Sequence, residues 1–248
     1  MNRGAAVLVG CAAFGIAAAA PIAPTTPVAP VAPVAALRPF DASYAVIWRG
    51  FTAGTSSFEL RQEASGEWTY VSHNRPRGLF RLVPTAALTL SSRMSVDAAG
   101  VRPLVFTATD PDDGRPQAEV HFDWTANRAT GLVEDTKIDM ALRPGVQDDL
   151  SVQVALIYAL SNDQTPTGIS LFDKKGIREY EYARVGAETL QTPVGALATT
   201  IYRSHKANSP RSTRFWCAPE LGYAPVQAEQ QYNGKVEWTM KLQAFHRD

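Results

Sequence analysis

Residues 211–245 read RSTRFWCAPELGYAPVQAEQQYNGKVEWTMKLQAF, and this stretch decides the fold that we predict for the chain. Polar and apolar residues alternate strictly from Lys235 to Gln243, with the apolar positions at Val236, Trp238, Met240 and Leu242. A period of two is that of a β-strand with one buried and one solvated face. The C-terminal part of the chain is therefore predicted to be a two-sided strand.

The sequence before this strand contains the hairpin signal Asn233-Gly234. A two-residue loop would place Trp238 opposite Glu229 and would mix polar and apolar residues on each face of the hairpin. A three-residue loop, Tyr232-Asn233-Gly234, places Ala228 opposite Trp238 and keeps one face apolar. We therefore predict the three-residue loop.

Short alternating segments separated by turn residues continue upstream of the hairpin. They lie at about residues 44–48, 56–61, 68–72, 86–96, 101–109, 117–124, 169–173, 177–185 and 197–204. Strands at this spacing are typical of antiparallel sheets, sandwiches and barrels. The fold class that we predict is mainly β, a curved antiparallel sheet or open half barrel of about ten strands.

One segment has a helical period instead. Residues 148–160 are predicted to form the main α-helix, packed on or in the sheet, with Asp148 as its N-cap. Neighbouring side chains on a helix do not face each other, so Asp148 and Asp149 are not expected to be a catalytic dyad. The apolar positions at helical spacing are Leu150, Val154, Ile157 and Tyr158.

The N-terminal sequence has the pattern of a Sec-type signal peptide. Arg3 is the one charged residue among the first 36, and an apolar run from Ala5 to Ala20 follows it. We predict a signal helix in residues 1–20, an extended Pro/Ala-rich linker in 21–36 and one β domain in 37–248. An uncleaved N-terminal anchor is the alternative. Cys11 resembles a lipidation site, but only about six apolar residues precede it, so we interpret it as part of the apolar core of the signal.

The charge of the domain is balanced. Without Arg3, 23 basic residues stand against 24 acidic ones, a net charge of −1. This balance indicates neither nucleic acid nor an anionic membrane surface as a partner. Cys217 is the one cysteine after the signal, so no disulfide is expected within the domain. We expect a monomer in the periplasm or secreted, with a membrane tether as the alternative.

The sequence offers no strong catalytic or metal-binding motif. Its four histidines lack zinc-ligand spacing, and His121 is expected on the solvated face of its strand. The acidic segment Asp110–Gly114 fits either a turn or a weak calcium site, and we favour the turn. Cys217 is interpreted as a small buried residue. We predict no catalytic residue, no metal and no cofactor.

Three groups of residues resemble a known family, the DUF3108 domain of exported bacterial proteins. They are Tyr44 with Gly50, Gly54 and Phe58; the Gln147–Ser151 sequence QDDLS; and the C-terminal TPVG (192–195), TRFW (213–216) and LGYAPV (221–226). The resemblance spans about residues 40–245. It implies a β domain of exported proteins and supplies no activity or functional residue.

Trp216, Trp238, Met240 and Ile157 are the candidate ligand-lining residues. Each fits either a filled core or the wall of an apolar cavity beneath the helix, because both arrangements require the same alternation. The first function hypothesis is non-enzymatic: binding of a lipid-like ligand, or a role in envelope assembly with an envelope protein as partner. A structural or interaction module with a filled core and no ligand is the alternative, and an enzyme is third.

The signal-peptide pattern leads to a direct test. The mature N-terminus is expected between about Ala18 and Leu37, because cleavage follows the apolar core of a signal peptide. N-terminal sequencing of the protein from an envelope fraction measures this. A lipidated Cys11 at the N-terminus would show that the segment is a lipoprotein signal instead.

Overall fold

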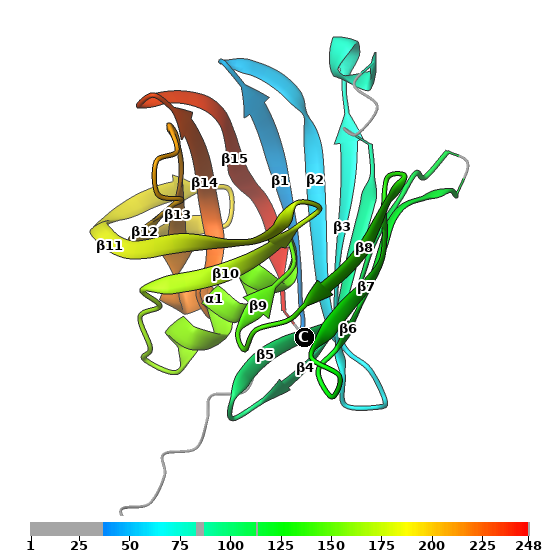
Figure 1. Cartoon of the computed structure of the whole chain (residues 1–248). Helices are drawn as coiled ribbons and strands as arrows, with labels where there is room; N and C mark the ends of the chain where they lie inside the picture. Colours follow the sequence, from blue (N-terminus) through cyan, green and yellow to red (C-terminus); the bar gives the residue numbers. More distant parts are fainter. Residues whose placement is uncertain (1–36, 83–86, 113, 248) are drawn as a thin grey trace, which may run out of the picture. The chain divides into compact units, whose positions relative to one another are not determined.

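The computed structural model describes residues 37–82, 87–112 and 114–247. Within them, fifteen strands form one sheet in the order β8-β7-β6-β5-β4-β3-β2-β1-β15-β14-β13-β12-β11-β10-β9 (Figure 1). All neighbours are antiparallel except β9 and β10. The strands are β1 (Phe40–Trp48), β2 (Phe51–Gln62), β3 (Trp68–Pro76), β4 (Thr89–Asp97), β5 (Gly100–Thr109), β6 (Pro116–Asp123), β7 (Arg128–Val133), β8 (Thr136–Ala141), β9 (Val146–Gln147), β10 (Gly168–Asp173), β11 (Gly176–Thr192), β12 (Gly195–His205), β13 (Arg211–Ala218), β14 (Ala224–Tyr232) and β15 (Lys235–His246).

The mainly β class, the open sheet and the single main helix agree with the sequence prediction, but the estimate of about ten strands is wrong. Strands β7, β8 and β9 follow one another between Trp124 and Asp148, where no strand is predicted. Ala129 is the one buried residue of β7, and Ile138 is the one buried residue of β8. Strands at the edge of a sheet bury little, so their sequences lack the alternation of large apolar residues that identifies the others.

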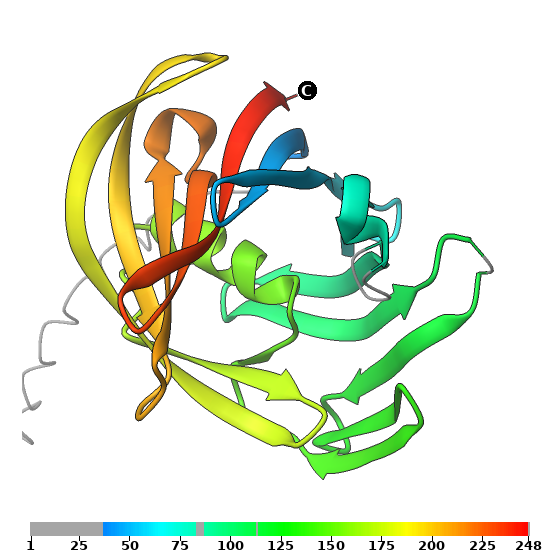
Figure 2. The ribbon, with the colours of Figure 1, turned by 90° about the horizontal axis from the view of Figure 1, so that it is seen from above.

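The sheet curls around α1 (Ser151–Ser161), which lies on its concave side (Figure 2). Backbone hydrogen bonds do not join β8 to β9 at the two ends of the strand order. Side chains bridge the two arms instead. The rings of Phe122 on β6 and Phe172 on β10 are 5.6 Å apart, and Lys174 Nζ lies 2.5 Å from a carboxylate oxygen of Glu134. The result is an incomplete barrel that is closed in part by packing.

The QDDLS sequence holds the start of α1. The carboxylate of Asp148 accepts hydrogen bonds from the backbone N–H groups of Leu150 and Ser151, at 2.8 and 2.7 Å. The hydroxyl of Ser151 accepts one from the N–H of Asp148, which makes the capping reciprocal. Gln147 Nε2 donates to the carbonyl of Val101 on β5. The side chain of Asp148 therefore caps the start of the helix as predicted, although the helix begins at Ser151 and Leu150 occupies the N-cap position.

A chain of aromatic rings covers the inner face of β15, β1, β2 and β3. Successive rings are 5.4–6.1 Å apart, in stacked or edge-on pairs that suit the quadrupoles of the rings. This part of the interior is filled. Its members, in order of contact, are Tyr44, Phe58, Tyr70, Phe40 and Phe245.

The predicted register of the last hairpin is wrong. The turn is the two-residue loop Asn233-Gly234, and both residues have positive φ, 48° and 75°. The extra residue lies in β15 instead, where Glu237 is left unpaired as a bulge. As a result Trp238 lies opposite Gln230 and not opposite Ala228. The bulge places Trp238 and Met240 on the inner face with Gln230 and Ala228, whereas Val236 pairs with Gln231 on the other face and is exposed.

The predicted signal helix and linker, residues 1–36, lie outside the described residues. Among the residues that are described, no helix has both the length and the apolar composition needed to span a bilayer.

Gly54 gives a test of the strand packing. A Cβ at this position would collide with the carbonyl oxygen of Arg75 and lie 2.9 Å from the Cα of Pro76 on β3. Gly54→Ala should therefore lower the free energy of unfolding by roughly 1–3 kcal/mol, measured by urea denaturation. Gly168→Ala is the matched control, because its Cβ would meet its nearest atom at 3.6 Å. An equal effect of both substitutions would contradict the close approach of β2 and β3.

Candidate functional site

A cavity of about 330 Å³ lies between α1 and the inner face of β10–β15. Three residues of α1 or its start line it on one side, and side chains of six strands line it on the other. Aromatic and aliphatic side chains form most of the wall. The lining residues are Asp149, Val152, Gln153, Ile169, Leu171, Tyr180, Tyr182, Ser204, Thr213, Phe215, Gln230 and Trp238.

Strand register places one row of these side chains side by side. Tyr182 pairs with Ser204, Ser204 with Thr213, Thr213 with Gln230, and Gln230 with Trp238. Directly paired residues in a sheet project from the same face and contact each other. The row therefore forms a continuous strip across the wall, polar in its middle and aromatic at both ends.

Two of the three lining residues on the helix side, Asp149 and Gln153, are polar, and Val152 is apolar. Gln153 Oε1 accepts a hydrogen bond from the hydroxyl of Tyr70 at 3.3 Å, which connects α1 to β3. Asp149 is accessible to solvent in the cavity, yet the surrounding protein raises the pKa of its carboxyl to about 6. Desolvation is the largest cause, followed by the negative charges of Asp148 and Asp173.

The four predicted ligand-lining residues do not meet in one cavity. Trp238 lines the cavity described above, and Ile157 lines a second one. Trp216 and Met240 line neither: Trp216 is buried and its indole N–H donates to a carboxylate oxygen of Glu188 at 2.5 Å, while Met240 packs against the core. The part of Trp238 and Ile157 in ligand binding stays a prediction.

The aromatic residues of the cavity that sequence reasoning missed are Tyr180, Tyr182 and Phe215. The two tyrosines alternate with glutamates in Glu179–Tyr182, and this strand was predicted. Alternation identifies the face of a strand but not the element that packs against that face. Phe215 directly precedes Trp216, so choosing the larger ring selected the wrong face of β13.

The second cavity, of about 460 Å³, lies beside the C-terminal half of α1. Arg247 lines it and donates through Nη2 to the carbonyl of Leu221 at 2.5 Å. Desolvation, and to a lesser extent the charge of Arg38, lower the pKa of this guanidinium. The lining residues are Leu37, Arg38, Phe40, Ile157, Ser161, Pro219, Glu220, Gly222, Tyr223 and Arg247.

Other candidates for chemistry have structural explanations. Within the described ranges, no three His, Cys, Asp or Glu side chains are placed to hold a metal ion. Cys217 is fully buried, and burial raises the pKa of its thiol to about 12, which suits the predicted small core residue. The carboxylate of Asp110 accepts the N–H of Asp112, as in an Asx turn. His121 is exposed and 2.9 Å from Glu119.

Comparison with models of known protein families shows to which family the chain belongs. The family model described as protein of unknown function (DUF3108) matches residues 43–240. The chain belongs to the DUF3108 family. The match confirms the resemblance seen in the sequence and includes every residue that lines the cavity. A search of curated proteins found no match for this DUF3108 chain.

Solved structures show how the DUF3108 fold relates to others. A β-barrel-like protein of the DUF1849 domain from Brucella abortus has a TM-score of 0.51 at 12% identity, covering 86% of this chain and 98% of its own. At that identity the likeness concerns the fold alone. A chain of the Pseudomonas aeruginosa MucA/MucB complex has a TM-score of 0.37 at 11% identity, covering 85% of this chain and 52% of its own.

The raised pKa of Asp149 predicts how stability depends on pH. The folded state keeps the proton up to a pKa of about 6, against 3.8 for the ordinary carboxyl, so the free energy of unfolding falls as pH rises through this interval. Asp149→Asn should remove that fall and raise the urea midpoint at neutral pH. Asp112→Asn, in the exposed loop between β5 and β6, is the control. An unchanged pH profile in Asp149→Asn would contradict the assignment.

Proposed function

We propose that this DUF3108 domain is a binding protein that holds the apolar part of an amphipathic ligand in the cavity between α1 and β10–β15. The observation that carries the proposal is that cavity, with its aromatic wall. Its volume of about 330 Å³ lies in the range typical of small-molecule sites. Binding of an apolar group against this wall would be favoured by roughly 25 cal/mol for each Å² of apolar surface that is removed from water.

The polar part of the wall supports an amphipathic ligand over a purely apolar one. Ser204, Thr213 and Gln230 form the middle of the row on the sheet, and Gln153 and Asp149 face the cavity from α1. Such groups orient a ligand by hydrogen bonds while the aromatic side chains supply the contact area. A lipid-like molecule with one polar end has the matching chemistry.

Binding explains the site better than catalysis does. A carboxyl with a pKa of about 6 is suited to proton transfer, but the other titratable groups that line the cavity are Tyr180 and Tyr182. Burial raises the pKa of both phenols, so both are protonated at neutral pH. Neither phenol is therefore poised as a nucleophile or base, and we propose a non-enzymatic role.

The place of action that we propose is outside the cytoplasm. The signal-peptide pattern of residues 1–20 supports this. The alternative of a structural module with a filled core fits the aromatic chain under β1–β3, but it gives no role to the cavity next to it.

A cavity-filling variant tests the proposal. Thr213→Phe places a ring in the row on the cavity wall, whereas Ser212→Phe places the same ring on the opposite face of β13. Binding of an apolar fluorescent probe should weaken at least about tenfold in the first variant, a cost of 1.4 kcal/mol or more, and stay unchanged in the second. Mass spectrometry of lipids that co-purify with the wild-type protein identifies the ligand class. Equal probe binding by both variants would overturn the proposal.

A further inference from the structure

Large apolar side chains are exposed together at one end of the sheet. They lie on the turn between β1 and β2, on the 3₁₀ helix η1 (Gly78–Leu82) after β3, and on the turn between β14 and β15. Figure 1 shows these three segments at the same end of neighbouring strands. We name the surface formed by these three segments the tip. Its exposed apolar residues are Trp48, Phe51, Leu79, Leu82, Tyr232 and Val236, of which Leu79 and Leu82 are 82% and 79% exposed.

The three segments of the tip are in contact with one another. The ring of Trp48 lies edge-on to Phe80 of η1, 5.7 Å away, and Trp48 pairs with Trp238 of β15. Ring and guanidinium pairs add to this: Arg49 lies over Trp48, and Arg211 over Tyr232. The tip is therefore one continuous surface.

The charge of the tip is basic. Arg49 and Arg211 share one carboxylate, that of Glu237, at 3.6 Å each. Arg77 and Arg81, exposed beside Leu79, form no ion pair with any acidic side chain that the structure describes.

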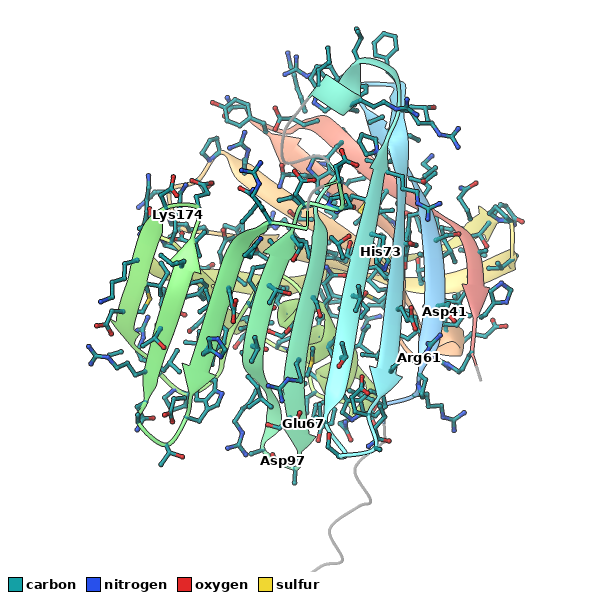
Figure 3. The ribbon with its side chains drawn as sticks, turned by 90° about the vertical axis from the view of Figure 1, so that its right-hand side faces the viewer. Asp41, Arg61, Glu67, His73, Asp97 and Lys174 are labelled. Atoms are coloured by element: carbon teal, nitrogen blue, oxygen red, sulfur yellow. The ribbon has the colours of Figure 1, made fainter. Side chains whose placement is uncertain are left out.

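Glu237 is the acidic side chain that pairs with arginines of the tip, and other acidic residues lie outside the tip. Figure 3 shows η1 at one end of the sheet and Glu67 and Asp97 at the other. On the end that carries the tip, the turns of the neighbouring strands β5–β8 bear Asp110, Asp112 and Glu134. The four arginines Arg49, Arg77, Arg81 and Arg211 thus give the tip a basic charge that the turns of β5–β8 do not share.

We propose that the tip docks on the surface of an anionic lipid bilayer, with Phe51, Leu79 and Leu82 inserted and Arg77 and Arg81 at the headgroups. Exposed aromatic and leucine side chains interleaved with arginine suit the interface between headgroups and acyl chains. The apolar side chains lie on turns at the strand ends, where they can insert into the interfacial region of a bilayer. The basic charge selects an anionic lipid over a neutral one.

The tip is also next to the cavity. Trp48 continues the row Tyr182–Trp238 onto β1, so the aromatic strip of the cavity ends at the docking surface. Docking would bring the Trp238 end of the cavity toward the bilayer, and this step rests on the proposed function. The docking itself does not depend on it, because vesicle binding and probe binding are measured separately.

Co-sedimentation of the full mature protein with lipid vesicles tests the docking. Wild-type protein should bind vesicles of phosphatidylcholine mixed with phosphatidylglycerol more tightly than vesicles of phosphatidylcholine alone, and added salt should weaken the preference. Leu79→Ser combined with Leu82→Ser should weaken binding to the mixed vesicles about tenfold or more. Arg77→Gln combined with Arg81→Gln should weaken it about tenfold or more and remove the preference for the anionic lipid.

The matched controls are exposed residues away from the tip. Leu132→Ser on β7, where the leucine is 54% exposed, and Arg143→Gln should bind vesicles as the wild type does. Urea midpoints close to that of the wild type show that the variants are folded. Phe51→Ser is a second variant of an apolar tip residue, and it should also weaken vesicle binding. Wild-type protein that binds neither vesicle overturns the proposal and leaves the tip as a protein-docking surface. Tip variants that bind like the controls overturn it as well.

Discussion

The buried carboxylate of Asp148 is the interaction on which the interior of this domain depends. It caps α1 and accepts a hydrogen bond of 2.6 Å from the buried hydroxyl of Ser92 on β4, so it fixes the start of the helix to the sheet. Burial raises the pKa of this carboxyl, while the hydrogen bonds from Ser151, Ser92 and Leu150 oppose the rise. Moving this carboxylate away from its hydrogen-bond donors would leave an unpaired charge in the interior, which is costly in free energy.

A helix anchored at that point is too small to cover the concave side. Eleven residues span about 16 Å, whereas fifteen strands side by side span about 70 Å before they curl. The helix packs on β4, β5 and β9, and the aromatic chain fills the space under β1–β3. Leu156 and Leu160 of α1 also pack with Tyr182, Tyr202 and Cys217, and the cavity is the part of the space between α1 and β10–β15 that this packing leaves open. The position of the cavity therefore follows from the point at which Asp148 fixes α1 to the sheet and from the short length of this helix.

The charged residues of this domain are distributed unevenly over its surface. A net charge of −1 for the domain gives no reason to propose an anionic membrane surface as a partner when the sequence is taken as a whole. The structure separates the charges in space, because the register brings turns that are far apart in the sequence to one end of the sheet. Residues 75–82, RPRGLFRL, contain three arginines and no acidic residue, and they meet Trp48 and Ala53 only in the folded sheet.

The sequence by itself determined the class of fold, the helix with its Asp148 cap and the family, because period, capping and motif order are local properties. Strands that bury a single residue, such as β7 and β8, left no such pattern, and the bulge at Glu237 has none. Only the tertiary structure decided which aromatic residues face the cavity. Trp216 and Phe215 are adjacent in the sequence and both carry aromatic rings, yet the pleat of β13 sends one into the core and the other to the cavity wall.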